Sequence, residues 1–217
     1  MNKIEQQIAT MLDMQNDINS KIDPDWKDKE RPWDRAIWVE AAEMMDHIGY
    51  KWWKHQGIDI YQVQLELVDI WHFALSMYLE AGVDVNELGR VFRVRLFGVQ
   101  ETADREAMLT SCEDFAARIM DTGEFPLAEF IDLMNVTGMS MDELYRQYVG
   151  KNVLNAFRQD HGYKEGTYIK SWNCEEDNVV LTRLLGMIDN AGEDCPHILR
   201  EALEDEYANV VAGDFCS

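Results

Sequence analysis

Apolar residues recur at intervals of three and four along most of the chain, which is the period of an amphipathic α-helix. The first repeat, with Ile4, Ile8, Met11 and Ile18, covers residues 3–20. Later repeats predict helices at 34–55, 60–80, 85–103, 106–121, after Pro126, and at 140–161, 179–189 and 197–211. No stretch shows the alternation that is typical of strands. The pattern therefore predicts an all-α, multi-helix bundle.

The length of 217 residues fits a single domain over 1–217. Within it we expect a helical core at about 1–110 and 140–172. Residues 173–217 are rich in acids and are expected to form a more mobile C-terminal extension with two short helices.

Two acidic pairs lie among the large hydrophobic residues of the second and third predicted helices. Glu40 and Glu43, and then Glu66 and Asp69, are each three residues apart, so the two members of a pair share a helix face. A single pair of this kind is also typical of a solvated face. The segment around Glu66 and Asp69, however, is apolar almost all round. Carboxylates are seldom buried unless they are paired or hold a metal, so the pattern favours a divalent cation site in the helical core.

Charge and cysteine usage narrow the class of protein. There are 41 Asp and Glu against 20 Lys and Arg, a net charge of −21, which argues against binding to nucleic acid or anionic membranes. The four cysteines are scattered, and we expect free thiols in a reducing compartment. Because the N-terminus lacks the apolar core of a signal peptide and no run reaches membrane-span length, we expect a cytoplasmic protein.

A cluster of cations follows in the predicted helix at 140–161 and the loop after it. Lys151, Asn155 and Arg158 are spaced so that they share one helix face, and Lys164 and Lys170 follow around two glycines. In so acidic a chain this cluster is suited to phosphate groups. The alternative is a helix C-terminus with favourable cations.

The acidic pairs and the cations together indicate a type of chemistry. Four carboxylates on two helices suit Mg²⁺, with Mn²⁺ as a substitute, or a di-iron pair, but di-iron bundles use Glu-x-x-His motifs that are missing here. A redox centre has no need of phosphate-binding donors. The combination therefore suggests cleavage of a nucleoside polyphosphate by metal-activated water.

These residues carry a resemblance to a known family. Glu-x-x-Glu followed by Glu-x-x-Asp on the next helix is similar to the all-α nucleoside triphosphate pyrophosphohydrolases. The segments at 15–19, 66–73 and 151–172 resemble the dimeric dUTPase branch specifically, and the resemblance runs from about residue 11 to 172. It implies a Mg²⁺-dependent homodimer that hydrolyses dUTP, and dUDP also, to dUMP, with pyrophosphate released from dUTP.

The resemblance also implies roles for individual residues. Glu40, Glu43, Glu66 and Asp69 match the metal ligands, and a carboxylate of the first pair, Glu40 in preference to Glu43, would orient or deprotonate the attacking water. Positions lining the nucleoside pocket are matched by Gln15, Asn19, Trp53, His72 and Phe73. The phosphate-binding set is matched by Lys151, Asn155, Arg158, Lys164 and Lys170.

Two alternatives stay open at the level of sequence. One is a dCTP or mixed dCTP/dUTP pyrophosphatase, because base choice turns on a few hydrogen bonds that a sequence does not display. The other is a non-catalytic helical protein that binds a nucleotide or a partner, in which the acids are merely solvated.

Overall fold

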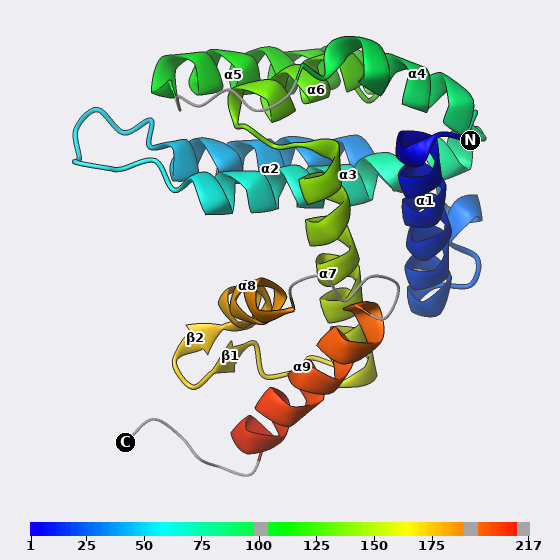
Figure 1. Cartoon of the computed structure of the whole chain (residues 1–217), viewed down its shortest axis with the longest axis vertical. Helices are drawn as coiled ribbons and strands as arrows, with labels where there is room; N and C mark the ends of the chain where they lie inside the picture. Colours follow the sequence, from blue (N-terminus) through cyan, green and yellow to red (C-terminus); the bar gives the residue numbers. More distant parts are fainter. Residues whose placement is uncertain (98–103, 189–194, 212–217) are drawn as a thin grey trace. The chain divides into compact units, whose positions relative to one another are not determined.

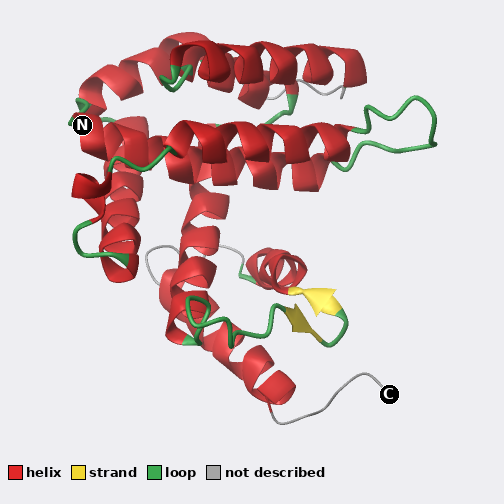
Figure 2. Cartoon of the chain, turned by 180° about the vertical axis from the view of Figure 1, so that it is seen from behind, coloured by secondary structure: helices red, strands yellow, loops and turns green. Residues whose placement is uncertain are grey.

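The computed structural model describes residues 1–97, 104–188 and 195–211. The helices are α1 (Lys3–Ile22), α2 (Trp33–Ile48), α3 (Ile60–Ala81), α4 (Val85–Arg95), α5 (Arg105–Thr122), α6 (Leu127–Val136), α7 (Met141–Asp160), α8 (Asp177–Met187) and α9 (Cys195–Val211), with a short 3-10 helix, η1 (Trp26–Lys29). Two short strands, β1 (Ser171–Trp172) and β2 (Glu175–Glu176), form a hairpin. Almost every described element is helical (Figure 2), which confirms the predicted all-α class.

The described residues fall into two compact units, 1–148 and 149–217, and the division lies within α7. The sequence suggested an extension that begins later, near residue 173. The greater mobility expected for the C-terminal part, and its place within a single domain, stay predictions.

The first unit is organised around the antiparallel pair of α2 and α3, which lie side by side in Figure 1. The buried face of α2 carries Ile37, Ala41, Met44 and Ile48, all fully buried at the three- and four-residue spacing of one helix face. Because α3 contacts both α1 and α2, it is buried on most sides. This explains why its sequence is apolar almost all round, and it places Glu66 within a packed interface.

Two predicted helices are shorter than expected. Helix α2 ends at Ile48 rather than near His55, because Gly49 adopts the left-handed conformation (φ 84°) and its N–H bonds back to Met45 and Asp46. Helix α4 ends at Arg95, where Leu96 is extended; the rest of the helix predicted to reach Ala103 includes residues outside those described.

The second unit holds the end of α7, the hairpin, α8 and α9 around its own apolar cluster. Phe157, Trp172, Leu181, Leu199 and Tyr207 are among the buried members of that cluster. The expectation of no strand is wrong here: Ser171 pairs with Glu176 and Trp172 with Glu175.

The two residues between the strands, Asn173 and Cys174, both have positive φ, as tight two-residue hairpin turns require. The hairpin leads directly into the first turn of α8. Cys112 and Cys195 carry thiols, as expected, but Cys174 is disulfide-bonded, so the expectation of four free thiols is wrong at that position. Cys216 lies outside the described residues.

Candidate functional site

An acidic cluster forms where α2 faces α3. Glu40 and Glu43 of α2 and Glu66 of α3 each bring a carboxylate oxygen within 4.8 Å of the others. Glu66 is only 7% exposed, Glu40 is half-buried and Glu43 is exposed. The structure therefore brings three of the four predicted metal ligands together. Asp69, one turn beyond Glu66, is half-buried and does not belong to this group of three.

The donor set of this cluster fits a hard divalent cation. Three carboxylates this close repel one another, and a cation with oxygen ligands relieves the repulsion. His47 Nε2 lies 3.5 Å from Glu66 Oε1. That contact is an interaction with a carboxylate, so the ligand chemistry of the cluster itself is all-oxygen, which suits Mg²⁺ or Mn²⁺ better than iron.

A buried polar network joins α1 to α3. Gln15 Nε2 donates to Asn19 Oδ1 (3.0 Å) and to Ser76 Oγ (3.1 Å), and Asn19 Nδ2 donates to the same hydroxyl (2.9 Å). His72 Nδ1 lies 2.8 Å from Gln15 Oε1. Three residues that the sequence assigned to the nucleoside pocket, Gln15, Asn19 and His72, are thus hydrogen-bonded together.

Two members of this network were missed by sequence reasoning. Ser76 Oγ donates to the carbonyl of His72 (3.2 Å), which leaves its lone pairs to accept from the amides of Gln15 and Asn19. Tyr148 Oη lies 2.9 Å from Gln15 Oε1, and its ring stacks on the His72 ring at 4.2 Å. For Ser76 the sequence did hold a signal, because a serine one turn after His72 in an otherwise apolar helix needs a polar partner.

The two predicted aromatic residues of the nucleoside pocket lie elsewhere in the first unit. Phe73 is half-buried, with its ring 6.1 Å from that of Trp33. Trp53 is 60% exposed and belongs to the loop between α2 and α3. That loop lies at the end of the α2–α3 pair away from α1 (Figure 1). There it lines a cavity of about 770 Å³ whose wall also includes Lys51, Gln56 and Arg105.

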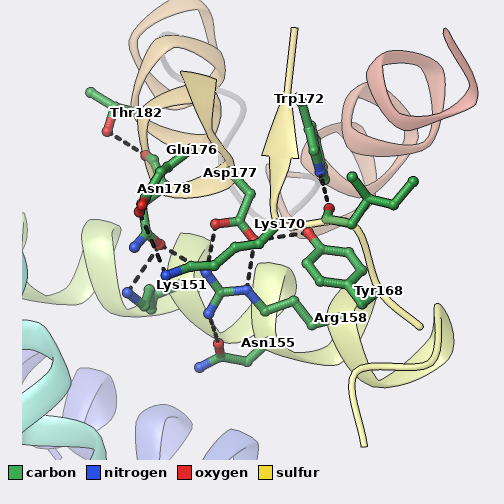
Figure 3. A network of polar contacts seen from close by, with 11 residues as sticks. Lys151, Asn155, Arg158, Tyr168, Lys170, Trp172, Glu176, Asp177, Asn178 and Thr182 are labelled. Carbon is green, nitrogen blue, oxygen red and sulfur yellow. Dashed lines mark hydrogen bonds and ion pairs between the residues drawn. The ribbon is translucent and has the colours of Figure 1, made fainter. Parts of the chain in front are cut away.

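Two of the predicted phosphate-binding cations, Lys151 and Arg158, are held in a polar network in the second unit (Figure 3). Arg158 Nε and Nη2 donate to the two carboxylate oxygens of Asp177, each over 2.8 Å. Arg158 Nη1 donates to Asn155 Oδ1 (3.1 Å). Lys151 Nζ donates to Asn178 Oδ1 (3.1 Å), which also accepts from Arg158 Nη2 (3.2 Å).

The two remaining members of the predicted phosphate set lie at the surface. Lys170 Nζ is 3.5 Å from Glu176 in the hairpin, and Lys164 is exposed in the turn after α7. Sequence reasoning missed Asp177 and Asn178, because polar residues in an acidic tail are expected to be solvated. Their place at the start of an apolar helical run was the available signal.

Burial and pairing act together on the ionisation of this network. Burial alone lowers the pKa of Arg158, but its hydrogen bond to Asp177 and the charge of that carboxylate outweigh burial and raise the pKa above its ordinary value. Burial, followed by the charge of Asp177, raises the pKa of the Tyr168 hydroxyl, which donates to Asp177 over 2.8 Å. Arg158 is therefore a cation, and Tyr168 a neutral donor, throughout the working range of pH.

Comparison with known proteins agrees with these features. No curated protein matches the sequence at a significant level. The protein family described as dUTPase, whose members are all-α and metal-dependent, matches residues 7–163, more than half of the chain. The match includes the acidic cluster, the buried network of Gln15 and the cations of α7, and it ends before Asp177. The chain therefore belongs to the dimeric all-α dUTPase family, and its activity is that of a dUTP diphosphatase.

Proposed function

We propose that the chain hydrolyses dUTP to dUMP and pyrophosphate, and dUDP to dUMP and phosphate, with Mg²⁺ held by the acidic cluster. The observation that carries this proposal is the group of Glu40, Glu43 and Glu66, in which a nearly buried carboxylate lies within 4.8 Å of two others. Such a group is costly to bury without a cation. Asp69 follows Glu66 by one turn and is proposed as a fourth ligand.

The residues of the cluster would divide the work of hydrolysis. A bound Mg²⁺ would supply Lewis-acid charge toward the phosphoryl oxygens. Glu40, or Glu43 beside it, would accept a hydrogen bond from the attacking water and take its proton. Glu43 is exposed and Glu66 nearly buried, so a solvent molecule reaches the α2 side of the cluster more readily than the α3 side.

The nucleoside would be bound by the polar network of α1 and α3. The side-chain amides of Gln15 and Asn19 donate to Ser76, and the Gln15 oxygen also accepts from Tyr148. These hydrogen bonds fix the direction of both amide groups. Binding of this kind discriminates strongly between bases, because a wrong base leaves a buried polar group unpaired. Trp53 and Phe73 lie apart from this network, so their role as aromatic contacts for the nucleoside stays a prediction from the sequence.

The phosphates would be bound by Lys151, Asn155, Arg158, Lys164 and Lys170. Charge stabilisation and positioning supply most of the catalysis of phosphoryl transfer, which explains the use of several donors in an otherwise acidic chain. A homodimer and a cytoplasmic location complete the proposal, and Mn²⁺ is expected to replace Mg²⁺.

A panel of nucleotides tests this function. Purified protein is incubated with each of the four common dNTPs, dUTP and dUDP, with Mg²⁺ and with excess chelator. Released pyrophosphate is measured, with phosphate for dUDP. We expect turnover of dUTP and dUDP that stops with chelator. Faster turnover of dCTP than of dUTP would replace the substrate assignment with the dCTP alternative. No turnover of any nucleotide would overturn the proposed reaction.

A further inference from the structure

We infer that Asp177 and Asn178, at the start of α8, are positioning residues for the phosphate-binding groups Arg158 and Lys151. This inference rests on the proposed function and extends it beyond the part of the chain that matches the family, which ends at residue 163. It assigns a role in phosphate recognition to the acidic C-terminal segment. The observations are the contacts, burial and charge of the network in Figure 3.

Asp177 is held firmly in place. Its side chain is 0% exposed, and its two oxygens accept three hydrogen bonds, two from Arg158 and one from Tyr168, all of 2.8 Å. It also lies in the first turn of α8, where the helix dipole favours a negative charge. A carboxylate with this many partners is not displaced readily by a substrate phosphate. Asp177 is therefore a fixed anchor rather than a competitor for the phosphate site.

The pairing decides which edge of Arg158 is available. A guanidinium has five N–H donors. The contacts within the described residues use the single Nε donor, both donors of Nη2 and one donor of Nη1, on Asp177, Asn178 and Asn155. One Nη1 donor is left for a ligand. Arg158 would therefore give a phosphate one directed hydrogen bond from Nη1, and not the two parallel bonds of its Nε–Nη2 edge.

Asn178 couples the two cations. Its Oδ1 accepts from both Lys151 Nζ and Arg158 Nη2, at 3.1 and 3.2 Å, so one amide oxygen sets the separation of two positive groups. Its backbone carbonyl accepts from Thr182 Oγ1 (2.8 Å) within α8. The tight hairpin at 171–176 leads into this first turn of α8, whose Asp177 and Asn178 accept hydrogen bonds from Arg158 and Lys151. The acidic tail thus carries the groups that orient the cations.

The test compares Asp177→Asn with wild type, using a hydrolysis assay and a binding assay. Asparagine keeps the size of the side chain but loses the charge and one acceptor. We expect kcat/KM for dUTP to fall roughly 10- to 100-fold, the size of effect for a charged hydrogen bond. Affinity for a non-hydrolysable dUTP analogue with Mg²⁺ should fall, while affinity for deoxyuridine should stay within about twofold. The matched control is Asp205→Asn, the same change of charge at an exposed position of α9, which should behave as wild type.

A double-mutant cycle with Arg158→Met separates positioning from general stability. If Asp177 acts through Arg158, Asp177→Asn should cost little further activity once Arg158 is replaced. Equal losses in both backgrounds, or an equal loss of affinity for deoxyuridine, would overturn the inference. Should Asp177→Asn fail to fold by circular dichroism, Asn178→Ala carries the same test. It is expected to lower kcat/KM for dUTP roughly three- to tenfold, as for a neutral hydrogen bond, without changing deoxyuridine affinity.

The outcomes for the two proposals are distinguishable. Wild-type protein that hydrolyses none of the nucleotides contradicts the proposed function. Wild-type protein that turns over dUTP while Asp177→Asn and Asn178→Ala match it contradicts the positioning role alone.

Discussion

At the scale of single residues, two buried side chains, Ser76 and Asp177, each hydrogen-bond to several other polar groups. Ser76 is fully buried and joins Gln15, Asn19 and the His72 carbonyl through one hydroxyl, while Asp177 does the same for Arg158 and Tyr168. Neither residue was singled out from the sequence, because the sequence alone does not show whether a serine or an aspartate is buried or solvated. The motifs predicted the groups that we propose to contact the ligand, but not the buried groups that hydrogen-bond to them.

The hydrogen bonds that Ser76 accepts from Gln15 and Asn19 lead to a prediction at this scale. Ser76→Ala leaves two amide donors of Gln15 and Asn19 without their shared acceptor, so the free energy of unfolding should fall by about 1–3 kcal/mol. KM for dUTP should rise, because the amides lose their fixed direction, and kcat should change less. Urea denaturation and steady-state kinetics measure both. A variant with wild-type stability and wild-type KM would show that the hydroxyl does not hold these amides.

At the scale of elements, hydrophobic periodicity predicted the helix interiors well and their ends less well. The hydrophobic period of α2 comes from a face, from Ile37 to Ile48, that is buried against neighbouring helices. Because that face needs apolar residues, its extent is visible in the sequence. The end of α2 depends instead on one residue, Gly49. The apolar residues Trp52 and Trp53 continue the hydrophobic pattern beyond it, so the sequence predicted a longer helix. The hairpin was missed because strands of two residues are too short to show alternation.

The end of α2 gives a prediction with an internal control. Alanine at Gly49 would be strained at φ 84°, and its Cβ would lie 3.0 Å from Gln56 Cβ and 3.1 Å from the Gly57 carbonyl. Gly49→Ala should therefore lower the free energy of unfolding by about 1–3 kcal/mol. Gly57→Ala in the same loop meets nothing within 4 Å and should be close to neutral. Equal melting temperatures for the two variants would contradict this account of the helix end.

At the scale of the whole molecule, the chain divides into a unit with the acidic cluster and a unit with the cations that are proposed to bind phosphate. None of the described helices is both long enough and apolar enough to span a membrane. The all-α class and the family were predictable, because both rest on helical periodicity and on motifs spread over most of the chain. The division within α7 was not, because the sequence runs through residues 148 and 149 as one continuous helix.

The proposed homodimer is tested at this scale. Light scattering at micromolar concentration should give about twice the chain mass of 25.2 kDa. Asp205→Asn, a change at an exposed position, serves as a control and should give the same mass. A monomer mass across the concentration range would contradict the dimer without bearing on the metal site.

The central claim, that the acidic cluster binds the catalytic metal, is tested most directly by Glu43→Gln. Glu43 is exposed, so the variant should keep the wild-type fold and melting temperature. Glu80→Gln, the same change at an exposed position near the end of α3, is the matched control. We predict that Glu43→Gln weakens Mg²⁺ binding in calorimetry and lowers dUTP turnover at least about 100-fold, while Glu80→Gln changes neither. Wild-type turnover and wild-type Mg²⁺ affinity in Glu43→Gln at low Mg²⁺ would contradict the account.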